Sequence, residues 1–246
     1  MIKIALLGKN IQNSKSPQIY EKIGEKYGVK IQFDLLDFDI DKIETSIRTL
    51  RQGVYEYIHV TAPYKEIILK FADEFSEPVK TIKATNLLFF KNLRLVADNT
   101  DYLGFMRSIE NFIEIDKKIL LLGGGGAAKS ALYALRDKNV DVFLRNKNKF
   151  DELKRINPNI KYVDRIINDY TNIIQCTSVG FNEQKCPIDT KEISNAKYAY
   201  DMIYTPEETL FLSEMKKNGS NVKNGYDMLV YQAEEAFTKY LNGEMK

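Results

Sequence analysis

The stretch Lys118-Ile119-Leu120-Leu121-Leu122-Gly123-Gly124-Gly125-Gly126-Ala127-Ala128 joins an apolar run to a run of glycines in the middle of the chain. The apolar half is typical of a buried parallel strand, and the pattern after the glycines predicts a helix over about residues 127–138. Gly123, Gly125 and Ala128 fit the spacing G-x-G-x-x-G/A, which makes a tight turn, lets a pyrophosphate approach the backbone and packs the helix on the strand. Helix N–H groups would then face the phosphates, so the stretch predicts a dinucleotide site.

Two other kinds of site share this spacing, a methyl-donor site and a plain strand-to-helix turn.

The residues after the next strand, Val140 to Leu144, distinguish an NAD site from an NADP site. An NAD site has Asp or Glu about 20 residues beyond the glycines to bind the ribose hydroxyls. Here the chain has Arg145, Asn146, Lys147, Asn148 and Lys149, and the three cations of this run favour the 2′-phosphate of NADP. A solvated basic turn remains the alternative.

Composition narrows the class of protein. The 246 residues carry a formal net charge of +2 that is spread along the chain, so charge does not indicate a nucleic-acid partner. No apolar segment approaches the roughly 20 residues that span a bilayer, and the first residues lack a secretory signal, so we expect a cytoplasmic protein. Two cysteines, Cys176 and Cys186, cannot form a zinc site alone, and no metal is predicted.

Strand and helix patterns alternate, which predicts an α/β fold. A substrate domain with a partly mixed sheet is expected over residues 1–101, and a doubly wound Rossmann-type domain over residues 102–225. The last helix, Asp227 to Leu241, has one apolar face that needs a partner, and residues 226–246 are expected to complete the first domain. The predicted helices of the first hundred residues are 17–27, 41–51, 64–71 and 78–83, and the predicted strands are 3–7, 32–36, 57–61, 87–90 and 94–97.

Ser14 and Ser16 lie where the first strand gives way to a helix. Ser16 is predicted to be the N-cap, with Pro17 at the first helical position. Capping alone would explain Ser16, but Ser14 has no predicted capping role. Two hydroxyls beside a helix N-terminus make a good carboxylate receptor.

The strand over residues 57–61 places Tyr57, His59 and Thr61 on one side by alternation. Lys65 is predicted in the first turn of the following helix, where the helix dipole would lower its pKa toward a catalytic range. A solvated lysine is the alternative. His59 is the only histidine, and it is either a general base or a polar residue lining the site.

Asp101 follows a strand and precedes a helix, so it is either a helix cap or a site residue. All these polar segments lie at strand ends that lead into helices, where open α/β sheets bind ligands.

The pattern closely resembles the shikimate dehydrogenase family over nearly the whole chain. Besides the glycine stretch, the matching motifs are Ser14-Lys15-Ser16-Pro17, Val60-Thr61-Ala62-Pro63-Tyr64-Lys65, Ala84-Thr85-Asn86-Leu87, Asp98-Asn99-Thr100-Asp101-Tyr102-Leu103-Gly104, Asp201-Met202-Ile203-Tyr204 and Gly225-Tyr226-Asp227-Met228-Leu229-Val230-Tyr231-Gln232-Ala233. The resemblance implies an NADP-dependent oxidoreductase of aromatic amino-acid (chorismate) biosynthesis that interconverts 3-dehydroshikimate and shikimate. A monomer or homodimer is expected.

The resemblance also implies roles for single residues. Lys65 and Asp101 would be the catalytic pair. Ser14, Ser16 and Tyr204 would bind the substrate carboxylate, and the residues around the ring hydroxyls would be Thr61, Lys65, Asn86, Asp101 and Gln232, with His59 lining the pocket. The cofactor-binding residues would be Gly123 to Ala128, Arg145, Asn146, Lys147, Thr177, Met202 and Gly225.

The chain departs from the family pattern at three places. The family usually has Asn at His59, Asn-Ala at Gln175-Cys176 and Arg-Thr at Lys147-Asn148. His59 is bulkier and titratable, so it could alter affinity, substrate range or pH dependence. Lys147 keeps the charge without the planar fork of arginine, and Arg145 could compensate.

The rival functions are a quinate or aminoshikimate dehydrogenase, a non-catalytic relative that senses such ligands and, with less support, a methyltransferase. Both Lys65 and Asp101 are retained, which argues against a mere sensor.

Overall fold

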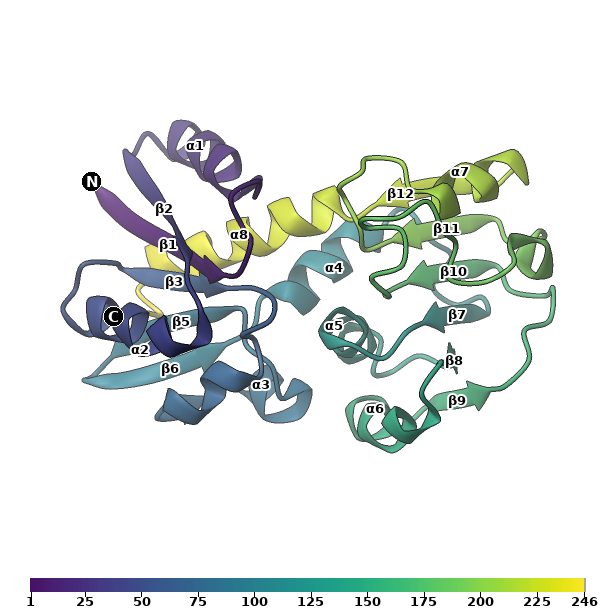
Figure 1. The fold of residues 1–246 in the computed structure, drawn as a ribbon, viewed down its shortest axis with the longest axis horizontal. Helices are drawn as coiled ribbons and strands as arrows, with labels where there is room; N and C mark the ends of the chain where they lie inside the picture. The colour runs from purple at the N-terminus through teal and green to yellow at the C-terminus, as the bar shows by residue number, and fades with distance from the viewer. Residues whose placement is uncertain (246) are drawn as a thin grey trace. The chain divides into compact units, whose positions relative to one another are not determined.

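The structure is a computed structural model, and it describes residues 1–245. The chain forms two compact units (Figure 1). The first contains residues 1–101 together with the chain from Gln232 onward, and the second contains Tyr102–Tyr231. The long C-terminal helix α8, Tyr226–Leu241, therefore contributes its later turns to the first unit. This confirms that the last helix returns to the first part of the chain.

The sheet of the first unit has the order β2-β1-β3-β5-β6-β4. β1, β2 and β3 are parallel, whereas β5 runs antiparallel to both β3 and β6, so the sheet is mixed as predicted. The strands are β1 (Ile2–Gly8), β2 (Ile31–Asp37), β3 (Tyr57–Val60), β4 (Glu74–Phe75), β5 (Leu87–Lys91) and β6 (Arg94–Asp98).

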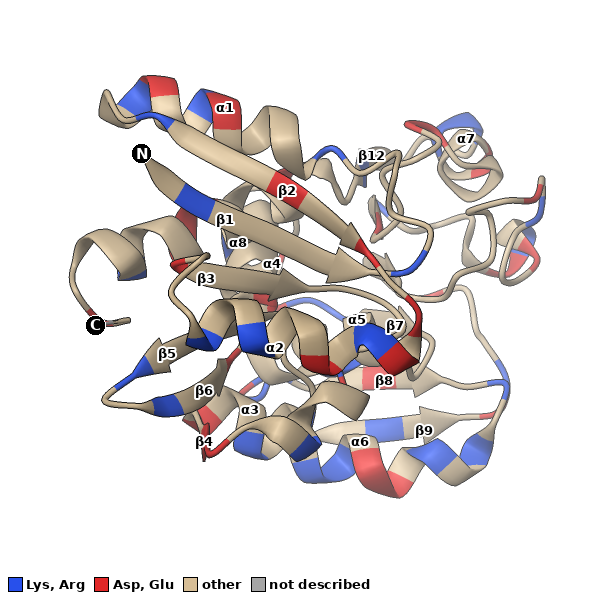
Figure 2. Ribbon diagram, turned by 60° about the vertical axis from the view of Figure 1, so that its left-hand side comes forward, with Lys and Arg blue, Asp and Glu red and all other residues tan. Residues whose placement is uncertain are grey.

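Alternation along β3 gives each face of this sheet its own helices. Ile58 and Val60 belong to a core that includes α2 (Ile43–Arg51) and α3 (Glu77–Ile82). Tyr57 and His59 point the other way, toward α1 (Ser16–Tyr27) and the later turns of α8, as their contacts with Tyr20 and Tyr240 show. The side chains of residues 57 and 59 therefore lie on the same face, as the alternation predicts. Acidic and basic residues both occur along α1 (Figure 2).

The second unit is a doubly wound parallel sheet of order β12-β11-β10-β7-β8-β9. Read from β9, this is the Rossmann order, with its switch point between β7 and β10. One face is covered by α4, α5 and α6 and the other by α7. The elements are α4 (Asp101–Ile109), β7 (Ile119–Leu122), α5 (Gly126–Ala134), β8 (Val140–Phe143), α6 (Phe150–Ile156), β9 (Ile160–Val163), β10 (Asn172–Gln175), β11 (Tyr198–Asp201), α7 (Leu210–Lys217) and β12 (Asn221–Asn224).

The helix predicted over residues 64–71 is wrong. Residues 62–66 form turns and a bend, and only Ile67–Phe71 forms a 3₁₀-helix, η2. Tyr64 and Ile68 are buried, and the Tyr64 hydroxyl donates to the Phe38 carbonyl at 2.6 Å, so tertiary contacts override the local pattern. Lys65 consequently does not sit in the first turn of a helix, and the dipole argument for its pKa does not apply.

Three further 3₁₀-helices complete the described chain, η1 (Ile40–Lys42), η3 (Lys147–Lys149) and η4 (Thr190–Ile193). Within residues 1–245, no helix combines the length and the apolar composition needed to cross a membrane.

Candidate active site

The polar residues of the first unit gather at one edge of its sheet. β1, β3 and β6 all end at this edge, and the antiparallel β5 begins there, because His59 is in register with Leu87 and Leu87 with Asp98. The loops beside these ends, and the first residues of α1 and α4, carry the polar residues Ser14, Ser16, Thr61, Lys65, Asn86, Thr100 and Asp101. The topology therefore collects at one place residues that lie up to 87 positions apart in the sequence.

Lys65 and Asp101 form an ion pair. The Lys65 Nζ donates to Asp101 Oδ2 at 2.6 Å, and the two side chains are 29% and 11% exposed. The other carboxylate oxygen, Oδ1, accepts from Asn86 Nδ2 at 2.8 Å. The backbone carbonyl of Lys65 accepts from the Thr85 N–H at 2.9 Å, which ties the lysine to the loop that carries Asn86. The carboxylate is thus held on both oxygens, while part of the ammonium stays open to a ligand.

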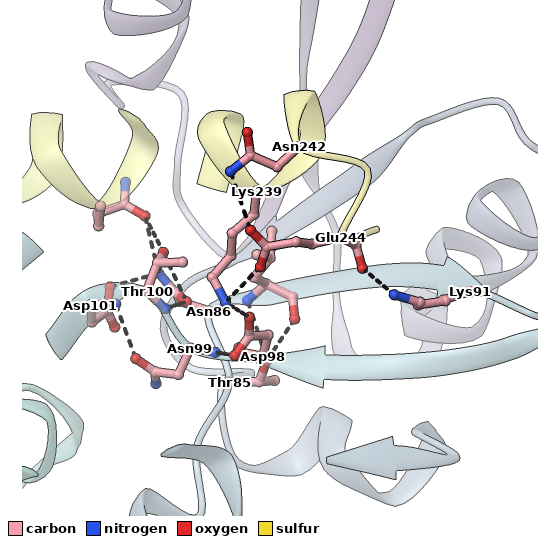
Figure 3. Close-up of polar contacts among 12 residues, drawn as sticks. Thr85, Asn86, Lys91, Asp98, Asn99, Thr100, Asp101, Lys239, Asn242 and Glu244 are labelled. Atoms are coloured by element: carbon pink, nitrogen blue, oxygen red, sulfur yellow. Dashed lines mark hydrogen bonds and ion pairs between the residues drawn. The ribbon is translucent and has the colours of Figure 1, made fainter. Parts of the chain in front are cut away.

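Asn86 is the centre of a buried polar network (Figure 3). Its Nδ2 also lies 3.0 Å from Thr100 Oγ1 and 3.0 Å from Gln232 Oε1, and its Oδ1 accepts from the Thr100 N–H at 2.7 Å. Asn86 and Gln232 are 2% and 7% exposed. The predicted substrate-binding residues Asn86, Asp101 and Gln232 are therefore in direct contact, across 146 positions of sequence.

A second set of polar residues holds this network, and the sequence analysis did not include it in the site. Asn99 Oδ1 accepts from the N–H of Asp101 at 3.0 Å, at the start of α4, and Asn99 Nδ2 donates to the Ala84 carbonyl. Asp98 accepts from the Asn99 N–H and from Lys239 Nζ of α8 at 2.7 Å. The motif 98–101 contained this signal, but which partner each side chain has depends on the fold.

Ser14 and Ser16 lie together where the chain enters α1. The helix begins at Ser16 with Lys15 as its N-cap, so the prediction that Ser16 is the N-cap is wrong by one position. The Ser16 N–H donates to Ser14 Oγ at 3.2 Å, and the two hydroxyl oxygens are 3.1 Å apart. Ser14, not Ser16, therefore satisfies a backbone donor of the first turn. The pair of hydroxyls expected beside this helix start is present.

His59 is buried, with 4% of its surface exposed, and its Nε2 lies 2.6 Å from the Tyr20 hydroxyl. Burial lowers the pKa of His59 from 6.5 to about 4, because the charged ring is poorly solvated there. The negative charge of Asp101 and a backbone hydrogen bond to Asn86 act in the opposite direction but are outweighed. His59 is therefore neutral at pH 7 and lacks the titration near its ordinary pKa that the sequence had suggested.

The residues expected to bind the cofactor lie at one edge of the second sheet. Leu122, Phe143, Gln175, Asp201 and Asn224 end neighbouring strands in register. The residues that follow these ends are Gly123, Arg145, Thr177, Met202 and Gly225. The edge includes the switch point between β7 and β10, which is where open α/β sheets bind ligands.

The glycine stretch has the backbone that its spacing predicts. Gly123 has φ +108°, and a Cβ there would lie 2.9 Å from Thr177 Cγ2, so only glycine fits this turn. A Cβ on Gly125 or Gly126 would meet open space, and α5 begins at Gly126. Ala128 is fully buried against the sheet. An exposed backbone at a helix N-terminus fits a pyrophosphate.

The basic turn after β8 is exposed. Asn146 caps η3 by accepting from the Asn148 N–H at 3.1 Å, while Lys147 Nζ lies 4.9 Å from the centre of the Tyr162 ring. Lys149, which the sequence analysis placed in the basic run but not among the cofactor-binding residues, reaches back so that its Nζ lies 3.4 Å from the Gly124 carbonyl oxygen. Three cations therefore lie near the glycine stretch or on the turn beside it, namely Arg145, Lys147 and Lys149. Their positive charge suits an anionic phosphate.

Two other predicted residues approach each other closely. A Cβ on Gly225 would lie 2.2 Å from the Met202 carbonyl oxygen, so glycine is required there. Tyr204, two residues beyond Met202, is half-buried in the second unit, and burial raises the pKa of its hydroxyl. In the part of the chain that the structure describes, no group of three or more His, Cys, Asp or Glu side chains could hold a metal ion.

Known proteins resemble the chain in sequence and in structure. The family model for the shikimate dehydrogenase substrate-binding domain matches residues 6–88. Shikimate dehydrogenase (NADP(+)) of Caldicellulosiruptor saccharolyticus is 39% identical over 96% of this chain and 91% of the relative. The protein of that name from Clostridium botulinum (strain 657) is 35% identical over 99% of this chain and 98% of the relative.

Two solved structures have the same fold. Shikimate dehydrogenase from Aquifex aeolicus is 28% identical with a TM-score of 0.89, covering 99% of this chain and 93% of that one. Shikimate 5-dehydrogenase from Thermus thermophilus, in complex with NADP(H) and shikimate, is 26% identical with a TM-score of 0.90, covering 99% and 94%. With relatives above 30% identity over nearly its whole length, the chain belongs to the shikimate dehydrogenase family.

Proposed function

We propose that the protein is an NADP-dependent shikimate dehydrogenase that reversibly reduces 3-dehydroshikimate to shikimate in aromatic amino-acid (chorismate) biosynthesis. Family membership supports the reaction, and the observation that carries it to this chain is the Lys65–Asp101 ion pair beside Asn86 and Gln232. A chain that had become a ligand sensor would have no need of a positioned proton donor.

Lys65 is the proton donor in this proposal. NADPH, when bound, supplies the hydride that adds to the C3 carbonyl carbon of the substrate. Negative charge then develops on the carbonyl oxygen, and the Lys65 ammonium stabilises that charge and donates a proton to it. Asp101, 2.6 Å from Nζ, orients the ammonium. In the reverse direction the Lys65 amine accepts the proton of the C3 hydroxyl.

The remaining residues bind and orient the substrate. Ser14, Ser16 and Tyr204 bind its carboxylate. Thr61, Asn86 and Gln232 contact the ring hydroxyls together with the catalytic pair, and His59 lines the site. The side-chain amide of Asn86 is already fixed by Thr100, Asp101 and Gln232, so it loses little rotational freedom when substrate binds.

The second unit binds the cofactor in this proposal. The backbone from Gly123 to Ala128 holds the pyrophosphate, and the turn over residues 145–147 binds the 2′-phosphate. Thr177, Met202 and Gly225 complete the site at the same sheet edge. The two functional domains would be residues 1–101 with 226–246 for the substrate, and residues 102–225 for NADP.

A substrate and cofactor panel tests the proposal. Purified protein is assayed for reduction of NADP and of NAD, each with shikimate and with quinate, and for oxidation of NADPH with 3-dehydroshikimate. We expect the highest kcat/KM for shikimate with NADP. A preference for quinate would assign the chain to the rival dehydrogenase, and tight binding of shikimate without turnover would assign it to a sensor.

The proposal includes a cytoplasmic location and a monomeric or homodimeric state. Free thiols at Cys176 and Cys186 are compatible with a reducing compartment. Gel filtration with light scattering measures the oligomeric state directly.

A further inference from the structure

A buried cluster of three polar rings lies behind the substrate site. The Tyr20 hydroxyl of α1 is 2.6 Å from His59 Nε2, 3.0 Å from the Tyr57 hydroxyl and 3.3 Å from the Ala233 carbonyl oxygen of α8. Tyr20 is 1% exposed, and its ring stacks on Phe33 with centroids 4.7 Å apart. The Tyr20 hydroxyl, which belongs to α1, therefore contacts both β3 and α8. The proposed mechanism does not use this hydroxyl.

The hydrogens of this cluster can be assigned by counting donors and acceptors. The Ala233 carbonyl can only accept, so the Tyr20 hydroxyl donates its single hydrogen to that carbonyl. The Tyr57 hydroxyl and His59 Nε2 must then supply the hydrogens of their own contacts with the Tyr20 oxygen.

The neutral ring has one N–H, so Nε2 carries the hydrogen and Nδ1 is bare. Tyr57 likewise donates its hydroxyl hydrogen to the Tyr20 oxygen. In this arrangement each of the three contacts of the Tyr20 hydroxyl has one hydrogen.

We propose that Tyr20 is a positioning residue of the substrate site, whose hydroxyl fixes His59 as the Nε2–H tautomer and steadies the start of the segment that carries Gln232. His59 is in register with Leu87, the residue after Asn86. Gln232, next to Ala233, contacts Asn86 through Oε1. Tyr20 therefore acts on two sides of the site without touching the substrate. The inference deepens the proposed function and rests on it for the ligand.

Because His59 is the only histidine, its tautomer can be tested directly. A long-range ¹H–¹⁵N spectrum of the full-length protein at pH 7 contains one imidazole, and it distinguishes a protonated nitrogen from a bare one. We expect Nε2 protonated and Nδ1 bare in the wild type. In Tyr20→Phe, Nε2 loses its acceptor, and we expect the two nitrogen signals to change. A wild-type ring protonated at Nδ1 would overturn the proposal.

Steady-state kinetics test the positioning role of Tyr20 in substrate binding. Tyr20→Phe keeps the stacked ring and removes only the hydroxyl, so we expect KM for shikimate to rise about fivefold or more, as for one lost hydrogen bond, with kcat within about twofold. The matched control is Tyr55→Phe, which also loses a hydrogen-bonded hydroxyl, here a part-buried one bonded to Asp34 at 3.0 Å, in a different part of the same unit. Equal KM in Tyr20→Phe and Tyr55→Phe would overturn the positioning role. Wild-type protein without shikimate turnover would refute the proposed function instead, and the tautomer measurement would still decide the role of Tyr20.

Discussion

Each oxygen of the Asp101 carboxylate has a different partner, and this division shapes the chemistry expected of Lys65. Oδ2 accepts from the ammonium and Oδ1 accepts from Asn86, so the carboxylate cannot rotate without breaking one of these bonds. A fixed carboxylate holds the ammonium in one place, and a positioned acid is most effective on charge that develops in the transition state.

Lys65→Ala should therefore lower turnover far more than it weakens substrate binding. The loss of a positioned acid costs about 10² to 10⁴ in rate. Steady-state kinetics with shikimate and NADP measure both constants. Lys70→Ala is the control, because Lys70 is an exposed lysine of η2 in the same segment. Near-normal kcat with a raised KM in Lys65→Ala would make Lys65 a binding residue only.

His59 should not be the proton donor. It is neutral at pH 7 and its Nε2 contacts Tyr20, so it has no proton to deliver at that pH. We expect His59→Asn to keep turnover with shikimate within about an order of magnitude, a barrier change of about 1.4 kcal/mol or less. A loss of a thousandfold or more, with normal circular dichroism, would assign the histidine a catalytic role.

At the scale of elements, the turn between β7 and α5 shows what sequence spacing can determine. The strand, the turn and the start of the helix are where the glycine pattern predicts them, since each is specified by residues that are adjacent in sequence, whereas the helix ends at Ala134, four residues before its predicted end. The segment 64–71 shows the opposite case. Its apolar spacing suits an α-helix, but the burial of Tyr64 and Ile68 decides its conformation, and those contacts come from distant parts of the chain.

Two glycine variants should separate folding from cofactor binding. A Cβ on Gly125 meets open space and φ is −90°, so Gly125→Ala should keep its thermal midpoint within a few degrees while NADP affinity falls. Gly123→Ala forces a side chain onto φ +108° and should cost about 1 to 2 kcal/mol of stability. Thermal unfolding and NADP titration measure both effects. Unchanged NADP affinity in Gly125→Ala would show that the pyrophosphate does not approach this backbone.

The basic turn after β8 should select the cofactor. Replacing Arg145 and Lys147 with Ala should weaken NADP at least about tenfold and leave NAD nearly unaffected, because a hydrogen bond to a charged group contributes about 1.5 to 3 kcal/mol. The double variant Arg155→Ala with Lys161→Ala removes the same two charge types from exposed positions of the same unit. The ratio of kcat/KM for NADP and NAD is the measurement. Equal ratios in the two double variants would identify the turn as solvated surface.

At the scale of the whole molecule, composition and strand patterning predicted two α/β units, one mixed and one parallel, and both sheets are present. The short β4 and the elements α6, α7 and β12 were not predicted, because few residues specify each of them and their stability comes from packing on the sheets. The contact of Asn86 with Gln232 could not be derived from spacing either. It depends on α8 packing on the face of β3 that carries Tyr57 and His59, and only the family resemblance pointed to it.

Two buried groups should make the stability of the two units depend on pH in opposite directions. The pKa of His59, in the first unit, is lowered by burial to about 4. The unfolded chain binds a proton at about 6.5, so it holds more protons than the folded state between these values. The stability from His59 is therefore present above pH 6.5 and is lost as pH falls toward 4, by about 3 kcal/mol in total.

Asp201, in the second unit, behaves in the opposite way. Burial raises its pKa from 3.8 to about 6, against hydrogen bonds from the Ile203 N–H and the Thr209 hydroxyl that lower it. The folded state keeps this proton to a higher pH than the unfolded chain does, so the stability is present below pH 3.8 and is lost as pH rises through 6, again by about 3 kcal/mol.

In the wild type the two trends offset each other between about pH 4 and 6, and single variants should reveal them. We expect the thermal midpoint of Asp201→Asn, relative to wild type, to improve as pH rises from 4.5 to 7, and that of His59→Asn to worsen. Thermal unfolding at half-unit pH steps measures the differences, and variant curves that run parallel to the wild-type curve would contradict both assignments.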